Sequence, residues 1–137
     1  TGGFTTFICW GFQPGGTQLS PLKTPGGEAY LRHCATARLM LDNFPHLQAG
    51  WVTDGIKMCQ LAMAYGCDDF GGVVFHEEVV KATGVHNQVK PQDAVRLIRD
   101  LGRVPAQRDT YYNILRTFPV GKDYPEGPKP SKLTLST

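Results

Sequence analysis

The side chains best suited to chemistry in this 137-residue chain are carboxylates, amides, aromatic rings and one arginine that follow short apolar runs. In parallel α/β folds, binding and catalytic residues gather at the carboxyl ends of the strands. A set of this kind can stack a purine or nicotinoid ring and hydrogen-bond ribose hydroxyls. The residues that follow the four runs are Trp10, Phe12 and Gln13; Trp51, Thr53 and Asp54; Asp69, Gly71 and Gly72, with His76, Glu77 and Glu78 beyond; and Gln107, Arg108 and Asp109, with Tyr111 and Tyr112 beyond.

Each of these residues also has a purely structural interpretation. Trp10 and Trp51 are of a type that commonly packs in a core. Asp54 and Asp109 can cap helices through their carboxylates. Arg108 can pair with its neighbour Asp109 at the surface, where such pairs contribute little. The functional interpretation therefore depends on the group meeting at one rim, because no single member establishes it.

The cysteines and histidines show no spacing typical of a metal site. The chain contains no CxxC pair, and its four cysteines are separated by 25, 25 and 8 positions inside apolar segments. We therefore expect free thiols that act as small hydrophobic residues in a reducing compartment, and no metal site. These residues are Cys9, Cys34, Cys59 and Cys67, with the histidines at His33, His46, His76 and His86.

Composition excludes several function classes. Lys plus Arg number 14 against 12 for Asp plus Glu, so the charge favours neither nucleic acid nor an anionic membrane. No apolar run approaches the ~20 residues of a membrane span, and no signal pattern is visible, so we expect a cytoplasmic protein. GxGxxG, P-loop, GxSxG and HExxH motifs are absent, and Gly71-Gly72 alone is a weak ligand-binding signal.

Four strands and several helices are predicted to position these side chains. β-branched and aromatic runs predict strands at 4–10, 47–52, 68–71 and 104–107. Apolar spacing of three and four, together with Pro, Gly and capping residues, predicts the helices. They begin at Pro25 with Thr24 as the cap, after the caps of 53–55, at Glu77, at Pro91 and at Thr110. They end at Phe44-Pro45, Gly66, Ala82, Gly102 and Arg116.

The alternation of strands and helices predicts parallel pairing and an α/β fold. Four such units form either a small open sheet or half of an eight-stranded barrel. The predicted domain covers residues 1–117, and Pro and Lys predict a poorly packed tail over 118–137. The chain begins with Thr and enters an apolar run at Phe4, which suggests a piece of a longer protein.

Four segments in register resemble a known enzyme family: FTTFICWGFQPGGTQL, ATARLMLDNFPHLQAGWVTDG, YGCDDFGG and PAQRDTYY. They resemble the C-terminal half of the radical S-adenosylmethionine enzymes of the futalosine route to menaquinone. Within that family, the first two segments favour the cyclic dehypoxanthine futalosine synthases over the aminofutalosine and deazaflavin-forming synthases. The resemblance implies the later strands and helices of a TIM-like radical S-adenosylmethionine barrel, a half-barrel of about four βα units.

The resemblance also implies a cofactor set that this chain does not complete. The family holds a [4Fe–4S] cluster on a CxxxCxxC loop and uses S-adenosylmethionine, but that spacing is absent here. We therefore expect the chain alone to bind neither and to be inactive without the N-terminal half of the barrel. Its expected partner is that half or a second copy of the chain, with which it would close the barrel. The implied substrate is dehypoxanthine futalosine; candidate substrate-binding residues are Asp69, Glu78, Gln107 and Arg108, and candidate cofactor-binding residues are Gln48 and Trp51.

Two other functions remain open at this point. A half-barrel can serve as a nucleoside-binding or interaction module without turnover. An open-sheet α/β enzyme can instead use Asp69, Glu77 and Arg108 directly. Complementation with the N-terminal half separates the first alternative from a radical cyclase, because only the cyclase regains activity.

Overall fold

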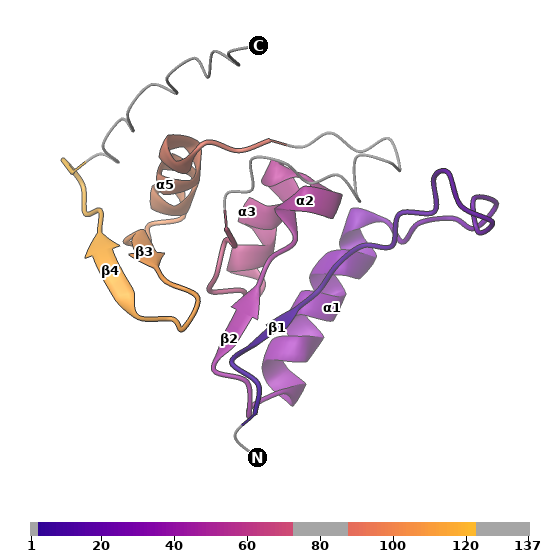
Figure 1. The fold of residues 1–137 in the computed structure, drawn as a ribbon, viewed down its shortest axis with the longest axis horizontal. Coiled ribbons are helices and arrows are strands. Elements are labelled where there is room, and N and C mark those ends of the chain that lie inside the picture. Colours follow the sequence, from indigo (N-terminus) through magenta and orange to yellow (C-terminus); the bar gives the residue numbers. More distant parts are fainter. Residues whose placement is uncertain (1–2, 73–87, 123–137) are drawn as a thin grey trace, which may run out of the picture.

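The computed structural model of the chain describes residues 3–72 and 88–122. These residues form short strands and helices in mixed order, which confirms the predicted combination of both element types (Figure 1). The elements are β1 (Thr6–Ile8), α1 (Gly27–Met40), β2 (His46–Gln48), α2 (Trp51–Asp54), α3 (Ile56–Ala64), α5 (Pro91–Asp100), β3 (Ala106–Arg108) and β4 (Ile114–Thr117).

The first three predicted strands pair in parallel, as the alternation with helices predicts. β1 pairs with β2 so that Phe7 lies opposite Leu47, and a single parallel bridge joins Gln48 to Asp69. The predicted third strand is thus reduced to one bridge, and the second is shorter than expected. Trp51 begins the short helix α2 instead of ending a strand.

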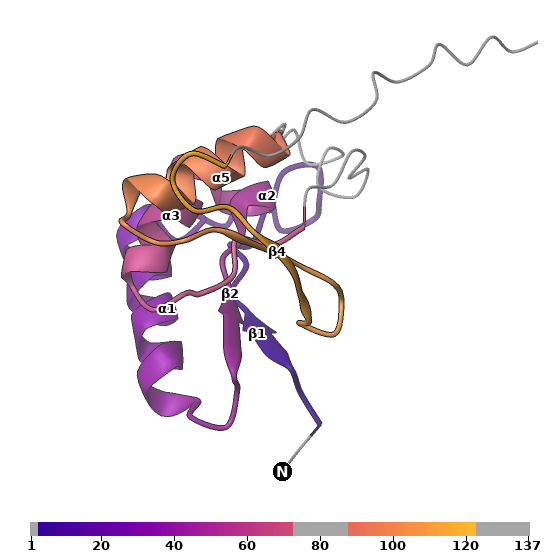
Figure 2. The ribbon, with the colours of Figure 1, turned by 90° about the vertical axis from the view of Figure 1, so that its left-hand side faces the viewer.

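The core lies between the β1–β2 sheet and the helices α1 and α3. Figure 2 shows both helices on the same side of this sheet. Leu47 of β2 is fully buried against them, and three cysteines fill the same interior as small apolar groups. The largest members of the core are Tyr30, Leu47, Trp51, Met63 and Phe70, with Cys34, Cys59 and Cys67 at 0–1% exposure.

Glycine residues follow the ends of α3 and α5, and a proline begins α5, as the sequence predicts. Gly66 follows α3 with φ 109°, and Gly102 follows α5 with φ 71°, a conformation that a residue without Cβ adopts at no steric cost. Pro91 occupies the first turn of α5. The predicted cap at Thr24 is wrong, because α1 starts two residues later and its N-cap is Gly26.

The segment predicted as a helix over 110–116 instead forms the turn of a hairpin and most of its second strand, β4. β3 and β4 pair antiparallel, with a register shift between Gln107 and Arg108. The helical prediction is wrong because the turn uses Tyr112 with φ 66°, a conformation that interrupts a right-handed helix. Phe118, where the tail was expected to begin, is only 3% exposed and packs beside the hairpin.

The described residues form two two-stranded sheets and one isolated bridge. The half-barrel therefore stays a prediction. None of the helices in the described ranges has the length and apolar character needed to cross a bilayer. The helix predicted over 77–82 lies outside the described residues.

Candidate functional site

An ion pair between Asp69 and Arg108 joins the end of the parallel strands to the β3–β4 hairpin. Nε and Nη2 of Arg108 donate to Oδ2 of Asp69 at 3.1 and 2.5 Å. The side chains are 10% exposed for Asp69 and 24% exposed for Arg108, so water screens the pair only in part. Burial lowers the pKa of Arg108, but the hydrogen bonds and charge of Asp69 outweigh it and raise that pKa overall.

The remaining polar atoms of the pair are also engaged. Oδ1 of Asp69 accepts the Gly71 N–H at 3.0 Å. Arg108 donates through Nη1 to the Asp109 carbonyl at 2.9 Å and through Nη2 to Oε1 of Gln48 at 3.4 Å. Gln48, Asp69 and Arg108 thus form one network at the carboxyl end of β2. Three residues that span 60 positions of the sequence meet there, as the prediction of a common rim requires.

Tyr112 extends this network from the turn of the hairpin. Its hydroxyl donates to Oδ2 of Asp69 at 2.6 Å. Its ring stacks on His46 with 3.9 Å between the ring centroids, and the Arg108 Cζ lies 4.0 Å from the Tyr112 ring centroid. Burial and the neighbouring Asp69 carboxylate raise the pKa of Tyr112 to about 12, so the phenol stays a hydrogen-bond donor at neutral pH.

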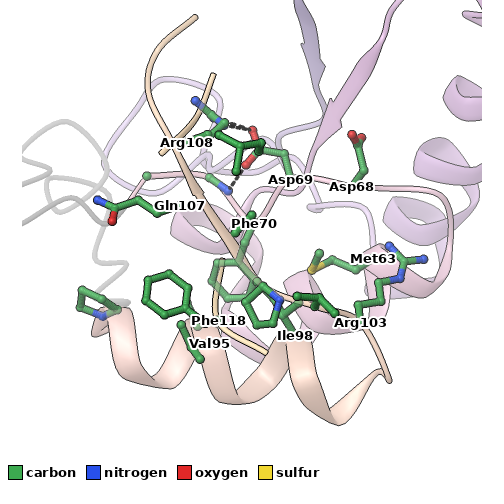
Figure 3. Close-up of a pocket in the computed structure, with 18 of the residues that line it drawn as sticks. Met63, Asp68, Asp69, Phe70, Val95, Ile98, Arg103, Gln107, Arg108 and Phe118 are labelled. Carbon is green, nitrogen blue, oxygen red and sulfur yellow. Dashed lines mark hydrogen bonds and ion pairs between the residues drawn. The ribbon is translucent and has the colours of Figure 1, made fainter. Parts of the chain in front are cut away.

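The network borders a cavity of about 560 Å³, a size that holds a small-molecule ligand. Figure 3 shows the Asp69–Arg108 pair at one end of this cavity, with Phe70, Val95 and Ile98 among its apolar lining. The cavity thus combines an apolar body with a small polar end. It lies between α5, the hairpin and the segment that carries Asp69.

Asp68 ties α1 to β2 beside this cavity. Its carboxylate accepts from the Leu47 N–H at 2.7 Å, from His46 Nδ1 at 2.7 Å and from Arg38 Nη2 at 2.5 Å. Burial raises the pKa of Asp68, but these three donors outweigh burial and hold the pKa below its usual range. His46 therefore touches both Asp68 and Tyr112, and it links two parts of the site.

The other predicted site residues fall in different surroundings. Gln107 lines the cavity, yet within the described part of the chain no hydrogen bond joins its side chain to Asp69 or Arg108. Trp51 is 3% exposed and donates its indole N–H to the Gly72 carbonyl at 3.2 Å. Its contact with a cofactor stays a prediction, as does the role of Glu78, which lies outside the described residues.

Asp54 and Asp109 do not cap helices. Gly55 is the N-cap of α3 and has no side-chain cap. Asp54 instead accepts the Gly11 N–H at 3.0 Å and the Thr53 hydroxyl at 2.7 Å. Asp109 organises the hairpin turn, and it meets Arg108 through its carbonyl oxygen rather than its carboxylate. Both carboxylates therefore hold loops at the carboxyl ends of strands.

The thiols do not fit an iron–sulfur cluster. A cluster needs three thiolates on one accessible loop. Here Cys34, Cys59 and Cys67 are at most 1% exposed in the core, and Cys59 donates to the Phe70 carbonyl at 3.8 Å. Burial also raises the pKa of Cys59 and so favours the neutral thiol. Within the described ranges, no group of three or more His, Cys, Asp or Glu can hold a metal ion.

Comparison with known proteins assigns the chain to a family. The family described as the CofH/MqnC C-terminal region matches residues 1–120, which is most of the chain and includes every residue of the network. The chain belongs to the CofH/MqnC C-terminal region family. The resemblance drawn from the four sequence segments is thereby confirmed.

Curated members of the CofH/MqnC family carry several names. The chain is 44% identical over 115 residues to a cyclic dehypoxanthine futalosine synthase of Halalkalibacterium halodurans, covering 84% of this chain and 31% of that protein. It is 40% identical over 121 residues to a 5-amino-6-(D-ribitylamino)uracil–L-tyrosine 4-hydroxyphenyl transferase of Methanoculleus marisnigri, covering 84% and 33%. An aminodeoxyfutalosine synthase of Thermus thermophilus is 35% identical over 124 residues, covering 86% and 33%.

The chain therefore spans about a third of the length of the curated CofH/MqnC relatives it matches. Two residues of the network were not among the predicted site residues, namely His46 and Tyr112. Tyr112 was noted only as a residue following the fourth strand. The Asp109-Thr110-Tyr111-Tyr112-Asn113 sequence carries the signal, because Asp followed by Asn four residues later can close a tight turn.

Proposed function

We propose that this chain is the C-terminal region of a cyclic dehypoxanthine futalosine synthase, a radical S-adenosylmethionine enzyme of menaquinone biosynthesis. The observation that supports this choice is the 44% and 41% identity to two proteins of that name, from Halalkalibacterium halodurans and Streptomyces coelicolor. Relatives with other activities are 34–40% identical. In this proposal the chain supplies one wall of the substrate pocket, and the cluster binds elsewhere in the enzyme.

The substrate class follows from the polar end of the cavity. Asp69 neutralises the charge of Arg108 and accepts hydrogen bonds from Nε and Nη2 of its guanidinium. These are two donors that arginine can use to bind a free carboxylate. A neutral pair of this kind suits hydroxyl groups, which both donate and accept hydrogen bonds. We therefore assign Asp69 and Arg108 to the sugar hydroxyls of the nucleoside-like substrate, with the apolar lining of the cavity around its ring.

The remaining candidates take supporting roles in this proposal. The Gln48 amide lies beside Arg108 and is the residue we assign to a polar group of S-adenosylmethionine. Trp51 stays a predicted cofactor contact, and its indole N–H is already bound to the Gly72 carbonyl. Gln107 lines the cavity and can contact a further hydroxyl. Glu78 stays a predicted substrate contact.

The test uses the full-length protein that carries this chain. After anaerobic reconstitution with iron and sulfide, it is supplied with S-adenosylmethionine and dehypoxanthine futalosine, and the products are analysed by mass spectrometry. We expect cyclic dehypoxanthine futalosine to form. Parallel assays look for aminodeoxyfutalosine and for 4-hydroxyphenyl transfer from tyrosine to 5-amino-6-(D-ribitylamino)uracil. Formation of either alternative product, or ligand binding without turnover, contradicts the proposal.

A further inference from the structure

Tyr112 has a backbone conformation that its side chain does not favour. Its φ is 66°, and it is the one non-glycine residue with positive φ in the part of the chain that the structure describes. Such a conformation is unfavourable for a residue with a Cβ, and it persists only where surrounding interactions impose it. The contacts of Tyr112 therefore have to outweigh the backbone strain.

The turn that carries Tyr112 is closed by one carboxylate. Oδ1 of Asp109 accepts the N–H groups of Tyr111 and Asn113 at 2.8 and 2.9 Å, and Oδ2 accepts the Asn113 amide at 2.8 Å. The backbone closes it further, since Tyr112 N–H donates to the Asp109 carbonyl at 3.2 Å. This turn presents one tyrosine to the sheet and leaves the other in solvent, with Tyr111 84% exposed.

The side chain of Tyr112 touches both members of the ion pair in different ways. Its hydroxyl donates to Oδ2 of Asp69 at 2.6 Å, the same oxygen that accepts from Arg108. Its ring contacts both the Arg108 guanidinium and the His46 ring. A hydrogen bond and a stacking contact from one residue restrict both the carboxylate and the guanidinium, which a single contact does not achieve.

We propose that Tyr112 is a positioning residue that holds the Asp69–Arg108 pair in its substrate-binding geometry. The proposal rests on the proposed function, because it assumes that this pair contacts the substrate. Tyr112 acts through Asp69: its hydroxyl is a third donor to Oδ2, the oxygen that already accepts Nε and Nη2 of Arg108, and from a different direction it keeps the carboxylate from rotating. The strained turn is the structural means by which the hairpin delivers this hydroxyl to the end of the parallel strands.

The experiment uses the full-length protein and two matched substitutions. Tyr112→Phe removes only the hydroxyl and keeps the ring contacts, while Tyr111→Phe makes the same chemical change one residue away at an exposed position. We expect Tyr112→Phe to raise KM for the substrate about tenfold with kcat within about twofold, because one hydrogen bond to a charged group is lost. Tyr111→Phe leaves both constants unchanged. In an Asp69→Asn background, Tyr112→Phe adds no further effect, as expected for action through Asp69.

A second measurement does not depend on substrate. With ¹⁵N-arginine labelling, the Nε–H signal of Arg108 is assigned by its loss in Arg108→Lys, and its exchange with water is compared among the variants. We expect at least tenfold faster exchange in Tyr112→Phe than in wild type or Tyr111→Phe. Unchanged exchange overturns the proposal, as does an unchanged KM or an additive effect in the Asp69→Asn background. If the wild-type protein is inactive in all three assays described under the proposed function, only that function is contradicted. The exchange measurement then decides the role of Tyr112.

Discussion

We expect Asp69→Asn to loosen the β3–β4 hairpin while leaving the α1–α3 core intact. Asp69 accepts hydrogen bonds from Arg108 and Tyr112 in the hairpin region and from the Gly71 backbone. Asn is nearly the same size, but it is neutral, and one of its two polar atoms is a donor instead of an acceptor. Either orientation of the amide therefore loses bonds that the carboxylate makes, and the Arg108 charge loses its partner.

The magnitude follows from the type of bond and its exposure. Asp69 accepts four hydrogen bonds, three at Oδ2 and one at Oδ1. With the amide oxygen of Asn in the Oδ2 position, the Gly71 bond is lost, and the other three fall from about 1.5–3 kcal/mol each to about 0.5–1.5 kcal/mol each because the acceptor is neutral. Arg108 is 24% exposed, so water compensates part of the loss. We therefore expect the free energy of opening the hairpin to fall by about 2–3 kcal/mol, which corresponds to roughly 30- to 150-fold faster exchange of its amides.

Hydrogen–deuterium exchange with mass spectrometry of the full-length protein measures this change peptide by peptide. Peptides covering 106–117 should exchange faster, while those of α1 should keep the wild-type rate. The matched control is Asp93→Asn in α5, where the same change affects an exposed pair with Arg96 at 3.8 Å. Exchange of the hairpin within twofold of wild type in Asp69→Asn would refute the central role of Asp69. Uniformly faster exchange across α1 would refute the claim that the effect is local.

Three further predictions concern other contacts. The folded-state pKa of Asp68 is depressed, so its carboxylate stabilises the fold above its unfolded pKa of ~3.8, and this contribution is lost as pH falls through the lower folded value. In Asp68→Asn, the melting temperature should therefore fall less steeply with decreasing pH below about pH 4. Gly11→Ala places a methyl group 2.4 Å from Oδ1 of Asp54, and should lower the free energy of unfolding in urea by about 1–3 kcal/mol. Arg99 donates to the carbonyls of Phe118, Pro119 and Lys122, so Arg99→Ala should speed amide exchange over 118–122 at least tenfold.

Each of these has a control close by in the chain. Gly72→Ala meets no atom within 4 Å, so an equal loss of stability there would contradict the steric argument for Gly11. Arg96→Ala removes an arginine of the same helix whose side chain is 66% exposed, and it should leave 118–122 unchanged. An acid limb as steep in Asp68→Asn as in wild type would show that other carboxylates govern the acid transition.

The sequence alone determined the elements whose signals are local. Apolar spacing with Pro91, Gly66 and Gly102 predicted α3 and α5, because helix periodicity and glycine or proline preferences act within a few residues. Alternation of strands and helices predicted the parallel pairing of β1 with β2. The buried thiols followed from cysteines placed inside apolar segments. The sequence also grouped Asp69 and Arg108 at one rim, and they do meet. The reason given for that grouping is wrong, because β3 pairs antiparallel with β4 and does not join the parallel strands.

Only the tertiary structure decided what those residues do to one another. Arg108 binds Asp69 rather than its neighbour's carboxylate, a choice made by partners 39 positions apart. The hairpin depends on Tyr112 adopting a positive φ, which local preference disfavours and long-range bonds stabilise. Trp51 lies in the core as its type suggests, but it begins the short helix α2 and does not end a strand. Contacts between distant segments outweigh local preferences of a few tenths to about 1 kcal/mol per residue, so no reading of neighbouring residues can supply them.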